Sequence, residues 1–220
     1  MANLRFYYGT MSSGKTMALL MAAHNLRNNA EKNIKLLKSS IDTKANDSVQ
    51  TRVAGGIEQK VDVLLEPDKS LVDYFEKWAE EKVTRVLVDE AQFLTEQQVK
   101  ELWYFSKVYN IPVDCYGLKS QFDLHLFQGS LPLIEYADEI LELQTIAVCT
   151  GCGEKATINA RFKDGNIELP GGERIVIDGS AAYEYKPLCG ECYIKEVEKF
   201  TGKPFVEIPK QKIKNPNEVK

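Results

Sequence analysis

Short apolar runs alternate with segments of helical periodicity through residues 1–144. Leu71, Val72, Phe75 and Trp78 recur at helical spacing, and a helix rich in apolar residues is expected over residues 15–29. Residues 39–58 are polar and lack clear periodicity, so we expect a mobile loop there. Strands alternating with helices predict βα units and a largely parallel sheet, which is an α/β fold. The expected strands are residues 4–8, 34–38, 61–65, 83–88, 113–116 and 140–143.

A further helix is expected after residue 94. Thr95, followed three positions later by Gln98, has the form of an N-terminal capping box. Apolar residues then follow at helical spacing.

The pattern changes after Gln144. Two Cys-x-x-Cys pairs and short alternating segments at residues 156–162 and 174–177 predict a small β-rich unit with little core of its own. The last residues are rich in Lys, Pro and Asn, which favours fraying at the chain end. We therefore expect a nucleotide-binding α/β domain over residues 1–145, a zinc-binding unit over residues 146–200 and a flexible tail over residues 201–220.

Composition narrows the class of protein. The 220 residues are 44% hydrophobic and 27% charged, which is typical of a globular protein and not of a disordered one. A net charge of −4 argues against a nucleic-acid partner, since such proteins usually carry a basic face. The first residues do not form a secretory signal, and no apolar run is long enough to span a membrane. We therefore expect a cytoplasmic protein with no membrane partner.

The first chemical motif is a complete phosphate-binding loop of the form G-x-x-x-x-G-K-T. It follows an expected strand and opens an expected helix, so that main-chain N–H groups would point at phosphates. Lys15 would neutralise the β- and γ-phosphates of ATP, and the Thr16 hydroxyl would hold Mg²⁺. The motif consists of Gly9, Thr10, Met11, Ser12, Ser13, Gly14, Lys15 and Thr16.

An acidic pair ends the β-branched run at residues 83–88. In phosphate-loop proteins, an Asp at this position holds Mg²⁺, which assigns that role to Asp89. Glu90 would then lie near the γ-phosphate and could accept a proton from the group that attacks phosphorus. If water attacks, the protein is an ATPase, whereas a substrate hydroxyl would make it a kinase. The two acidic residues alone leave both reactions open.

Four of the five cysteines form the two pairs. Cys149 with Cys152, and Cys189 with Cys192, supply the four thiolates that suit tetrahedral Zn²⁺. The 36 residues between the pairs indicate a metal that clips the ends of a long loop. Four protein ligands leave no open position, so we expect structural zinc. Cys115 lies inside an expected strand and is expected to be a core thiol.

These motifs, in this order and spacing, resemble the type II thymidine kinases. The resemblance covers about residues 1–195 and includes Phe6 to Thr16, Val86 to Leu94, Cys115 to Leu118 and the cysteine pairs around Val176 to Gly179. It implies a RecA-like domain and a zinc-held lasso that closes over thymidine. It further implies that Glu90 deprotonates the thymidine 5′-hydroxyl, that dTTP inhibits the enzyme, and that the enzyme is a homotetramer.

The resemblance also implies a thymine pocket. Without it, Phe122 and Phe127 would be read as packing residues. Main-chain groups of the lasso and one tyrosine would contact the base, and the sequence offers two tyrosines. Counting from Gly179 favours Tyr183 and counting back from Cys189 favours Tyr185, and we favour Tyr183. The implied thymidine-binding residues are Met11, Phe93, Leu118, Phe122, Phe127, Val176, Ile177 and Tyr183.

Two other functions fit parts of the sequence. A zinc-ribbon ATPase acting on nucleic acid would explain the phosphate loop, the Asp-Glu-Ala-Gln box and the cysteines, although the chain has room for one RecA-like lobe only. A nucleotide switch of the GTPase type is disfavoured because no guanine-reading Asn-Lys-x-Asp motif is present. Arg52, in the expected mobile loop, is a candidate for a phosphate contact, although an arginine in a loop is more often simply solvated.

Overall fold

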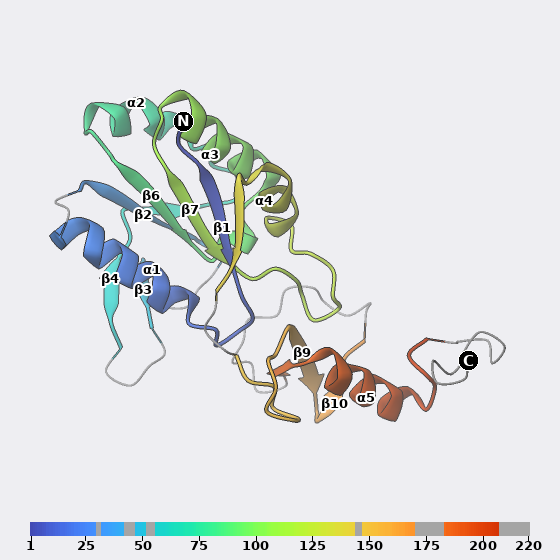
Figure 1. Cartoon of the computed structure of the whole chain (residues 1–220). Helices are drawn as coiled ribbons and strands as arrows, with labels where there is room; N and C mark the ends of the chain where they lie inside the picture. Colours follow the sequence, from blue (N-terminus) through green and yellow to red (C-terminus); the bar gives the residue numbers. More distant parts are fainter. Residues whose placement is uncertain (30–31, 42–46, 52–55, 144–146, 170–182, 207–220) are drawn as a thin grey trace, which may run out of the picture.

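The computed structural model describes residues 1–29, 32–41, 47–51, 56–143, 147–169 and 183–206. Its main feature is a six-stranded sheet in the order β5-β2-β6-β7-β1-β8 (Figure 1). Every pairing in this sheet is parallel, which confirms the expected α/β class. The strands are β1 (Leu4–Tyr8), β2 (Ile34–Ser39), β5 (Val63–Leu65), β6 (Arg85–Asp89), β7 (Val113–Gly117) and β8 (Glu139–Glu142).

Helices cover both faces of the sheet (Figure 1). On one face, α1 (Lys15–His24) buries Leu19 and Leu20 in a cluster with Leu36 and Leu87. On the other face lie α2 (Val72–Glu80), α3 (Glu96–Val108) and α4 (Ser130–Tyr136). The strands are apolar on both sides because both sides are covered. Their carboxyl ends, where ligands bind in folds of this kind, carry the phosphate loop and the acidic pair.

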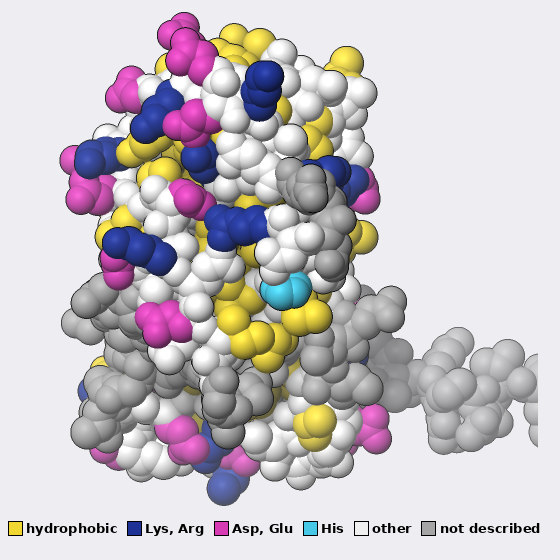
Figure 2. Space-filling view, turned by 90° about the vertical axis from the view of Figure 1, so that its left-hand side faces the viewer, with side chains coloured by type: hydrophobic (Ala, Val, Ile, Leu, Met, Phe, Trp, Pro, Cys, Tyr) yellow, Lys and Arg dark blue, Asp and Glu magenta, His cyan; other side chains and the backbone are white. Residues whose placement is uncertain are grey.

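Charged side chains of both signs are interspersed on the face of the molecule seen in Figure 2. Among the described residues on that face, no broad region carries basic side chains alone. No helix within the described ranges has the length and apolar character needed to cross a bilayer.

The cysteine pairs lie in a second, smaller unit. Its antiparallel sheet has the order β10-β9-β11 and packs with a helix around a separate hydrophobic cluster. The helix was not predicted, so the unit is not purely β. The division into residues 1–145, 146–200 and 201–220 stays a prediction. The elements are β9 (Ile158–Lys163), β10 (Asn166–Ile167), β11 (Tyr183–Leu188) and α5 (Gly190–Thr201).

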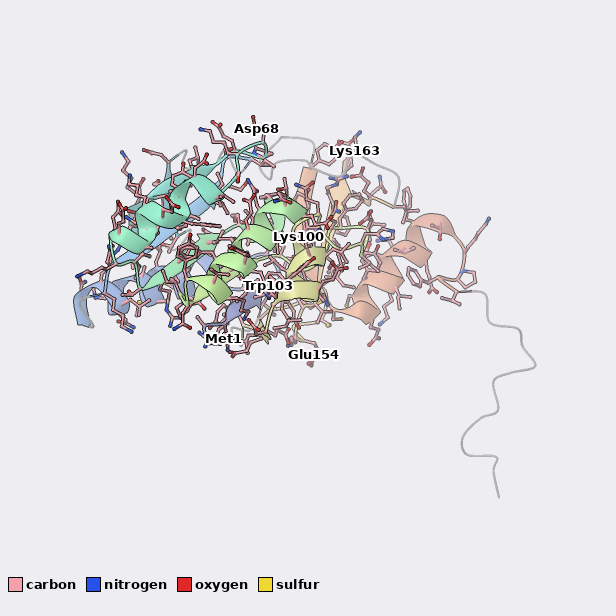
Figure 3. The ribbon with its side chains drawn as sticks, turned by 90° about the horizontal axis from the view of Figure 1, so that it is seen from above. Met1, Asp68, Lys100, Trp103, Glu154 and Lys163 are labelled. Carbon is pink, nitrogen blue, oxygen red and sulfur yellow. The ribbon has the colours of Figure 1, made fainter. Side chains whose placement is uncertain are left out.

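The predicted capping box at the start of α3 is confirmed. The Gln98 main-chain N–H donates to Thr95 Oγ1 at 3.2 Å, and Gln98 Oε1 accepts from the Thr95 N–H at 3.1 Å. Seen from above, α3 with Lys100 and Trp103 runs beside both α2 and α4 (Figure 3). Phe75 of α2 packs on Phe105 of α3, with ring centroids 4.7 Å apart.

Several predicted boundaries are wrong. The helix expected over residues 15–29 is an exception: it forms over that range, as α1 to His24 and then as a π-helical turn, η1 (Asn25–Asn29). Part of the expected loop at 39–58 pairs as an antiparallel hairpin of β3 (Ser48–Gln50) and β4 (Glu58–Lys60). Each of these strands has only three residues, which is too short for an alternating pattern to be recognised in the sequence. The helix α4 was also missed, because it is short and has Pro132 in its first turn.

Candidate active site and metal centre

The phosphate loop connects β1 to the first residue of α1, as its motif predicts. Gly14 has a φ of 77°, in the left-handed region that favours glycine, and it lies directly before the helix. Lys15 is buried, and its Nζ donates to the Thr10 carbonyl at 2.8 Å. The loop therefore curls around the lysine ammonium, which lies at the positive end of the helix dipole.

Two hydroxyls of this loop are buried and lack a hydrogen-bond partner in the described part of the chain: Thr10 Oγ1 and Ser13 Oγ. Buried polar atoms are usually paired, so such atoms mark a site where a ligand supplies the partner. A Cβ atom on Gly9 would lie 2.3 Å from Ser13 Oγ, so the loop could not pack this tightly with a larger residue there. Phosphate oxygens fit as partners for both hydroxyls.

The two predicted magnesium ligands lie together at the carboxyl end of β6. The Thr16 hydroxyl, at the start of α1, donates to Asp89 Oδ2 at 3.4 Å. Asp89 is 4% exposed, so its carboxylate is shielded from bulk water. An alcohol oxygen and a carboxylate oxygen beside a phosphate loop are the ligand types that Mg²⁺ prefers. The donor set therefore fits Mg²⁺ arriving with ATP.

Glu90 follows Asp89 in a left-handed conformation, with a φ of 49°. Its Oε2 accepts a hydrogen bond from Gln92 Nε2 at 2.6 Å. Gln92 Oε1 in turn accepts from the Leu118 main-chain N–H at 3.0 Å. Glu90 is thus aimed by a side chain that is itself fixed to the segment after β7. Gln92 lies within the sequence motif that includes Asp89 and Glu90, but the motif alone predicts no role for it.

Only some of the residues predicted to wall a thymine pocket lie within the described ranges, and Phe93 and Phe127 are in contact. The Phe93 and Phe127 rings meet edge to face with centroids 5.9 Å apart. Leu118 follows β7 and is half-buried. Phe122 is buried and lies under the guanidinium of Arg161, whose Cζ is 3.7 Å from the ring centroid.

Several predictions for this pocket fall outside the described residues or stay open. Val176 and Ile177 lie outside the described ranges, as does Arg52. Tyr183 and Tyr185 both belong to β11, next to β9. The Arg161 Cζ lies 5.2 Å from the Tyr183 ring centroid, and Arg161 Nη1 donates to the Tyr185 hydroxyl at 3.4 Å. Which tyrosine contacts the base stays a prediction.

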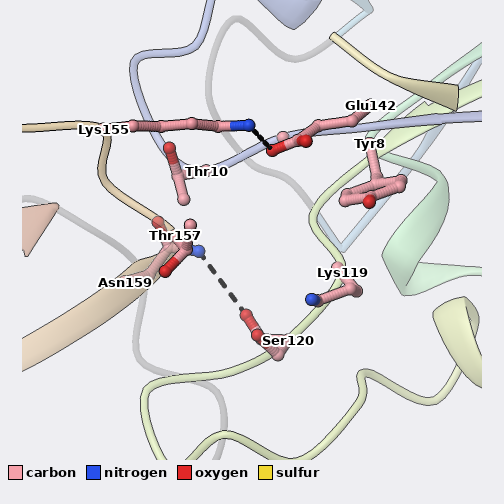
Figure 4. Close-up of a pocket in the computed structure, with 9 residues that line it drawn as sticks. Tyr8, Thr10, Lys119, Ser120, Glu142, Lys155, Thr157 and Asn159 are labelled. Atoms are coloured by element: carbon pink, nitrogen blue, oxygen red, sulfur yellow. Dashed lines mark hydrogen bonds and ion pairs between the residues drawn. The ribbon is translucent and has the colours of Figure 1, made fainter. Parts of the chain in front are cut away.

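A polar cavity of about 190 Å³ adjoins the phosphate loop between the two units (Figure 4). Lys155 forms an ion pair with Glu142 on one side, at 2.6 Å. The amide of Asn159 extends from β9 toward Ser120 on the other side. The cavity lining is Tyr8, Gly9, Thr10, Lys119, Ser120, Glu142, Lys155, Thr157 and Asn159.

The four paired cysteines converge on one point. All four Sγ atoms lie within 4.8 Å of one another. The Cys189 sulfur accepts from the Cys192 main-chain N–H at 3.4 Å and thereby caps α5. A Cβ atom on Gly151 would lie 2.9 Å from Cys192 Sγ, so the first pair needs glycine at that position. This donor set could hold tetrahedral Zn²⁺ with no open position.

The thiol pKa values fit a metal site. Burial raises the pKa of Cys149, but backbone hydrogen bonds at Cys189, Gly151 and Cys152 lower it by more, so that the net pKa is about 6. The sulfurs of Cys152 and Cys149 raise the pKa of Cys192 to about 12. The neighbouring groups therefore act on these thiols in opposite directions, and a bound cation would favour the thiolate form of all four. In contrast, burial raises the pKa of Cys115, which lies in the core as expected.

Comparison with known proteins agrees with this geometry. The family model "Thymidine kinase" matches residues 2–193. A thymidine kinase of Lactobacillus acidophilus is 39% identical over 197 residues, covering 86% of this chain and 94% of that protein. The thymidine kinase of Enterobacteria phage T4 is 39% identical over 192 residues, with the same coverage of 86% and 94%.

A third relative agrees with the first two. A thymidine kinase of Shewanella oneidensis is 36% identical over 184 residues, covering 84% of this chain and 93% of that protein. Among solved structures, domain III of the Thermotoga maritima replication initiation protein DnaA overlays 65% of this chain and 55% of its own, with 18% identity and a TM-score of 0.38, which is too low to bear on function. On the family model and these relatives, the chain belongs to the thymidine kinase family.

Proposed function

We propose that this protein transfers the γ-phosphate of ATP to the 5′-hydroxyl of thymidine to give dTMP, in nucleotide salvage. The observation that carries the proposal is the Glu90 carboxylate, which is held by Gln92 at 2.6 Å, one residue after the Asp89 that contacts Thr16. A fixed carboxylate beside a nucleotide site suits proton abstraction from an alcohol. Membership of the thymidine kinase family supports thymidine as that alcohol.

In the proposed reaction, Glu90 takes the proton of the 5′-hydroxyl as its oxygen bonds to the γ-phosphorus. The bond between that phosphorus and the β–γ bridging oxygen breaks, and ADP leaves. Lys15 and the loop amides neutralise charge on the phosphates, and Thr16 and Asp89 would hold Mg²⁺, which supplies further neutralisation when bound. Catalysis is then mostly positioning and electrostatics.

The nucleoside would lie between Glu90 and the aromatic walls. Phe93 and Phe127 offer an apolar slot of the kind a methylated pyrimidine needs. We propose Met11, Leu118, Phe122, Val176 and Ile177 as further walls. We propose Tyr183 as the tyrosine that contacts the base, since Arg161 already engages the Tyr185 hydroxyl.

Zinc in this proposal is structural. Four thiolates would fill its coordination sphere, so it has no position for substrate. Its binding energy would stabilise the smaller unit, whose hydrophobic cluster is limited. We also propose that the enzyme works in the cytoplasm, because free clustered thiols suit a reducing compartment.

The proposal also includes a homotetrameric assembly and inhibition of the enzyme by dTTP. Light scattering on purified protein tests the first. For the second, dTTP should raise the apparent melting temperature, since a ligand that binds only the folded state stabilises it. It should also compete with thymidine in initial-rate assays.

A nucleoside panel tests the activity. Purified protein with ATP and Mg²⁺ is given thymidine, deoxyuridine, deoxycytidine or no nucleoside, and both nucleoside monophosphate and ADP are quantified. Thymidine should give dTMP and ADP in equal amounts, with little ADP in the absence of nucleoside. Deoxyuridine is the acceptor most similar to thymidine and measures tolerance at the methyl position. ADP release that depends on single-stranded DNA and ignores thymidine would overturn the proposal in favour of a nucleic-acid ATPase.

A further inference from the structure

Strand β9 forms the boundary between the cysteine-bearing unit and the phosphate-loop unit. Successive side chains of a strand point to opposite faces. Ala160 and Phe162 belong to the hydrophobic cluster of the smaller unit. Asn159 and Arg161 alternate with them, and the contacts of both reach the other unit. One face of β9 therefore builds the smaller unit's core, while the opposite face contacts the elements that carry the candidate site.

Asn159 is bonded to the phosphate loop itself. Its Oδ1 accepts from the Met11 main-chain N–H at 2.7 Å, and its Nδ2 donates to the Ser120 carbonyl at 3.5 Å. The side chain is 5% exposed, so water competes little for these bonds. Met11 is the third residue of the loop. A single amide thus ties the loop to the segment that follows β7.

Arg161 contacts the nucleoside side of the site instead. Its guanidinium lies over the Phe122 ring at 3.7 Å, a stacking geometry that Arg favours. Its charge is balanced by Glu168, whose Oε2 lies 2.6 Å from Arg161 Nε. Arg161 is fully buried. The segment that contains Phe122 has a second contact with the smaller unit, because the Tyr193 hydroxyl donates to the Phe122 carbonyl at 3.5 Å.

We propose that Asn159 and Arg161 are positioning residues with separate effects: Asn159 holds the phosphate loop in its ATP-binding shape, and Arg161 holds Phe122 as a wall of the nucleoside pocket. The Arg161 part rests on the proposed thymidine kinase function, whereas the Asn159 part requires only that the loop binds ATP. Sites bind well when their contact residues are locked by a supporting layer of side chains. Here that layer comes from the unit that carries the cysteines.

The test is a pair of affinities measured on each full-length variant. Asn159→Leu keeps side-chain bulk but removes the acceptor for the Met11 N–H, and Asn159→Ala replaces it if the leucine does not fold. Either should weaken binding of Mg²⁺ with a non-hydrolysable ATP analogue by roughly tenfold, the effect of losing one buried hydrogen bond. Thymidine affinity should fall by much less, because Met11 forms only one of the proposed walls of the nucleoside pocket. Asn166→Leu, the same change at an exposed position of β10, is the matched control and should alter neither affinity.

For the second residue, Arg161→Met is combined with Glu168→Gln so that no buried charge is left alone. This double variant should weaken thymidine binding by roughly tenfold, the loss of about one stacking and cation–π contact, and leave the ATP analogue unaffected. Arg161→Lys keeps the charge but not the flat stacking surface. Its thymidine affinity should therefore lie between that of the wild type and that of the double variant. Glu168→Gln alone removes the ion-pair partner of the buried Arg161 and should lower the melting temperature, but it keeps the stack on Phe122 and should leave thymidine affinity near that of the wild type.

Metal content and melting temperature are recorded for every variant. The proposal is supported if the Asn159 variant loses mainly affinity for the ATP analogue and the Arg161 double variant loses mainly affinity for thymidine, both at unchanged metal content. Equal loss of both ligands, or loss that follows metal content, would overturn it, because it would indicate a purely structural role. If the wild type binds the ATP analogue but not thymidine, the proposed function and the Arg161 role both fail. The Asn159 role is then judged on ATP affinity alone.

Discussion

Gln92 Nε2 lies 2.6 Å from Glu90 Oε2, and the same Gln92 side chain accepts the Leu118 main-chain N–H through its Oε1. One amide group therefore sets the distance between the proposed base and a proposed wall of the nucleoside pocket. Gln92 is 1% exposed, which leaves it little freedom to turn. The arrangement explains how a glutamate at the end of a strand can keep one direction.

Replacing Gln92 should therefore impair the proposed role of Glu90 as a base while leaving the Glu90 side chain itself unchanged. Gln92→Leu keeps the volume but removes both hydrogen bonds, one of them to a charged group, which is worth about 1.5–3 kcal/mol. We expect kcat for thymidine phosphorylation to fall by roughly 10- to 100-fold, with ATP affinity unchanged. Gln97→Leu on the exposed side of α3 is the control and should keep the wild-type kcat. Equal rates in the two variants would mean that Gln92 does not position the base.

Gly129 offers a test of how tightly the segment after Glu90 is packed. A Cβ atom there would lie 2.6 Å from the Ala91 carbonyl oxygen and 2.7 Å from that of Leu94. Gly129→Ala should cost about 1–3 kcal/mol of unfolding free energy, the usual effect of overpacking. Urea denaturation measures it. Gly190→Ala, where a Cβ meets nothing within 4 Å, serves as the control and should not be destabilising.

The metal prediction concerns stoichiometry and pH. Purified protein should carry one Zn²⁺ per chain, and cobalt in its place should show thiolate charge-transfer absorption. Because metal binding displaces protons from the thiols, the apparent affinity should fall as the pH is lowered. A chelator should therefore strip the metal more readily at pH 6 than at pH 8, and the melting temperature should drop with it.

The cysteines themselves provide the control for that experiment. Cys152→Ser should lower metal content and the melting temperature together. Cys115→Ala should leave metal content unchanged, because Cys115 lies in the core of the main sheet. Loss of metal from the Cys115 variant, or full metal content after Cys152→Ser, would contradict the four-cysteine site.

A pH effect on stability is expected at Asp138. Burial raises the pKa of its carboxyl, but hydrogen bonds from Lys107 and the Leu4 main-chain N–H lower it by more, so the net pKa lies below the ordinary value of 3.8. A carboxyl with a lowered folded-state pKa stabilises the protein above its unfolded pKa, and this stabilisation is lost as the pH falls through the folded value. Asp138→Asn should thus cost roughly 1 kcal/mol at pH 7. The difference from wild type should shrink as the pH falls below the ordinary carboxyl pKa, and a difference that stays constant in acid would contradict the assignment.

Local sequence predicted the features that depend on neighbouring residues. The phosphate loop, the strand that ends at Asp89 and the Thr95 capping box each lie within a few consecutive positions, and each forms where its motif stands. The helix α5 was missed because its N-cap is Cys189, a residue interpreted only as a metal ligand. A capping role for a thiol has no common sequence signal.

The supporting residues of the site could not be predicted in this way. Gln92 reaches Leu118 across 26 positions, and Asn159 reaches Met11 across 148. Neither pairing leaves a periodic or compositional trace, because each depends on how distant segments pack. Motifs therefore predicted where the phosphate loop, the acidic pair and the cysteine cluster lie, whereas the residues that hold them in place could be identified only from the three-dimensional structure.

Transfer of the labelled γ-phosphate from ATP to thymidine, measured for the wild type and for Glu90→Gln, tests the central claim most directly. The wild type should form labelled dTMP only when thymidine is present. Glu90→Gln should bind the ATP analogue as the wild type does but lose roughly 10²- to 10⁴-fold in kcat, the usual contribution of a general base. Labelled phosphate released to water instead of thymidine, or a Glu90→Gln variant that works at the wild-type rate, would contradict the account.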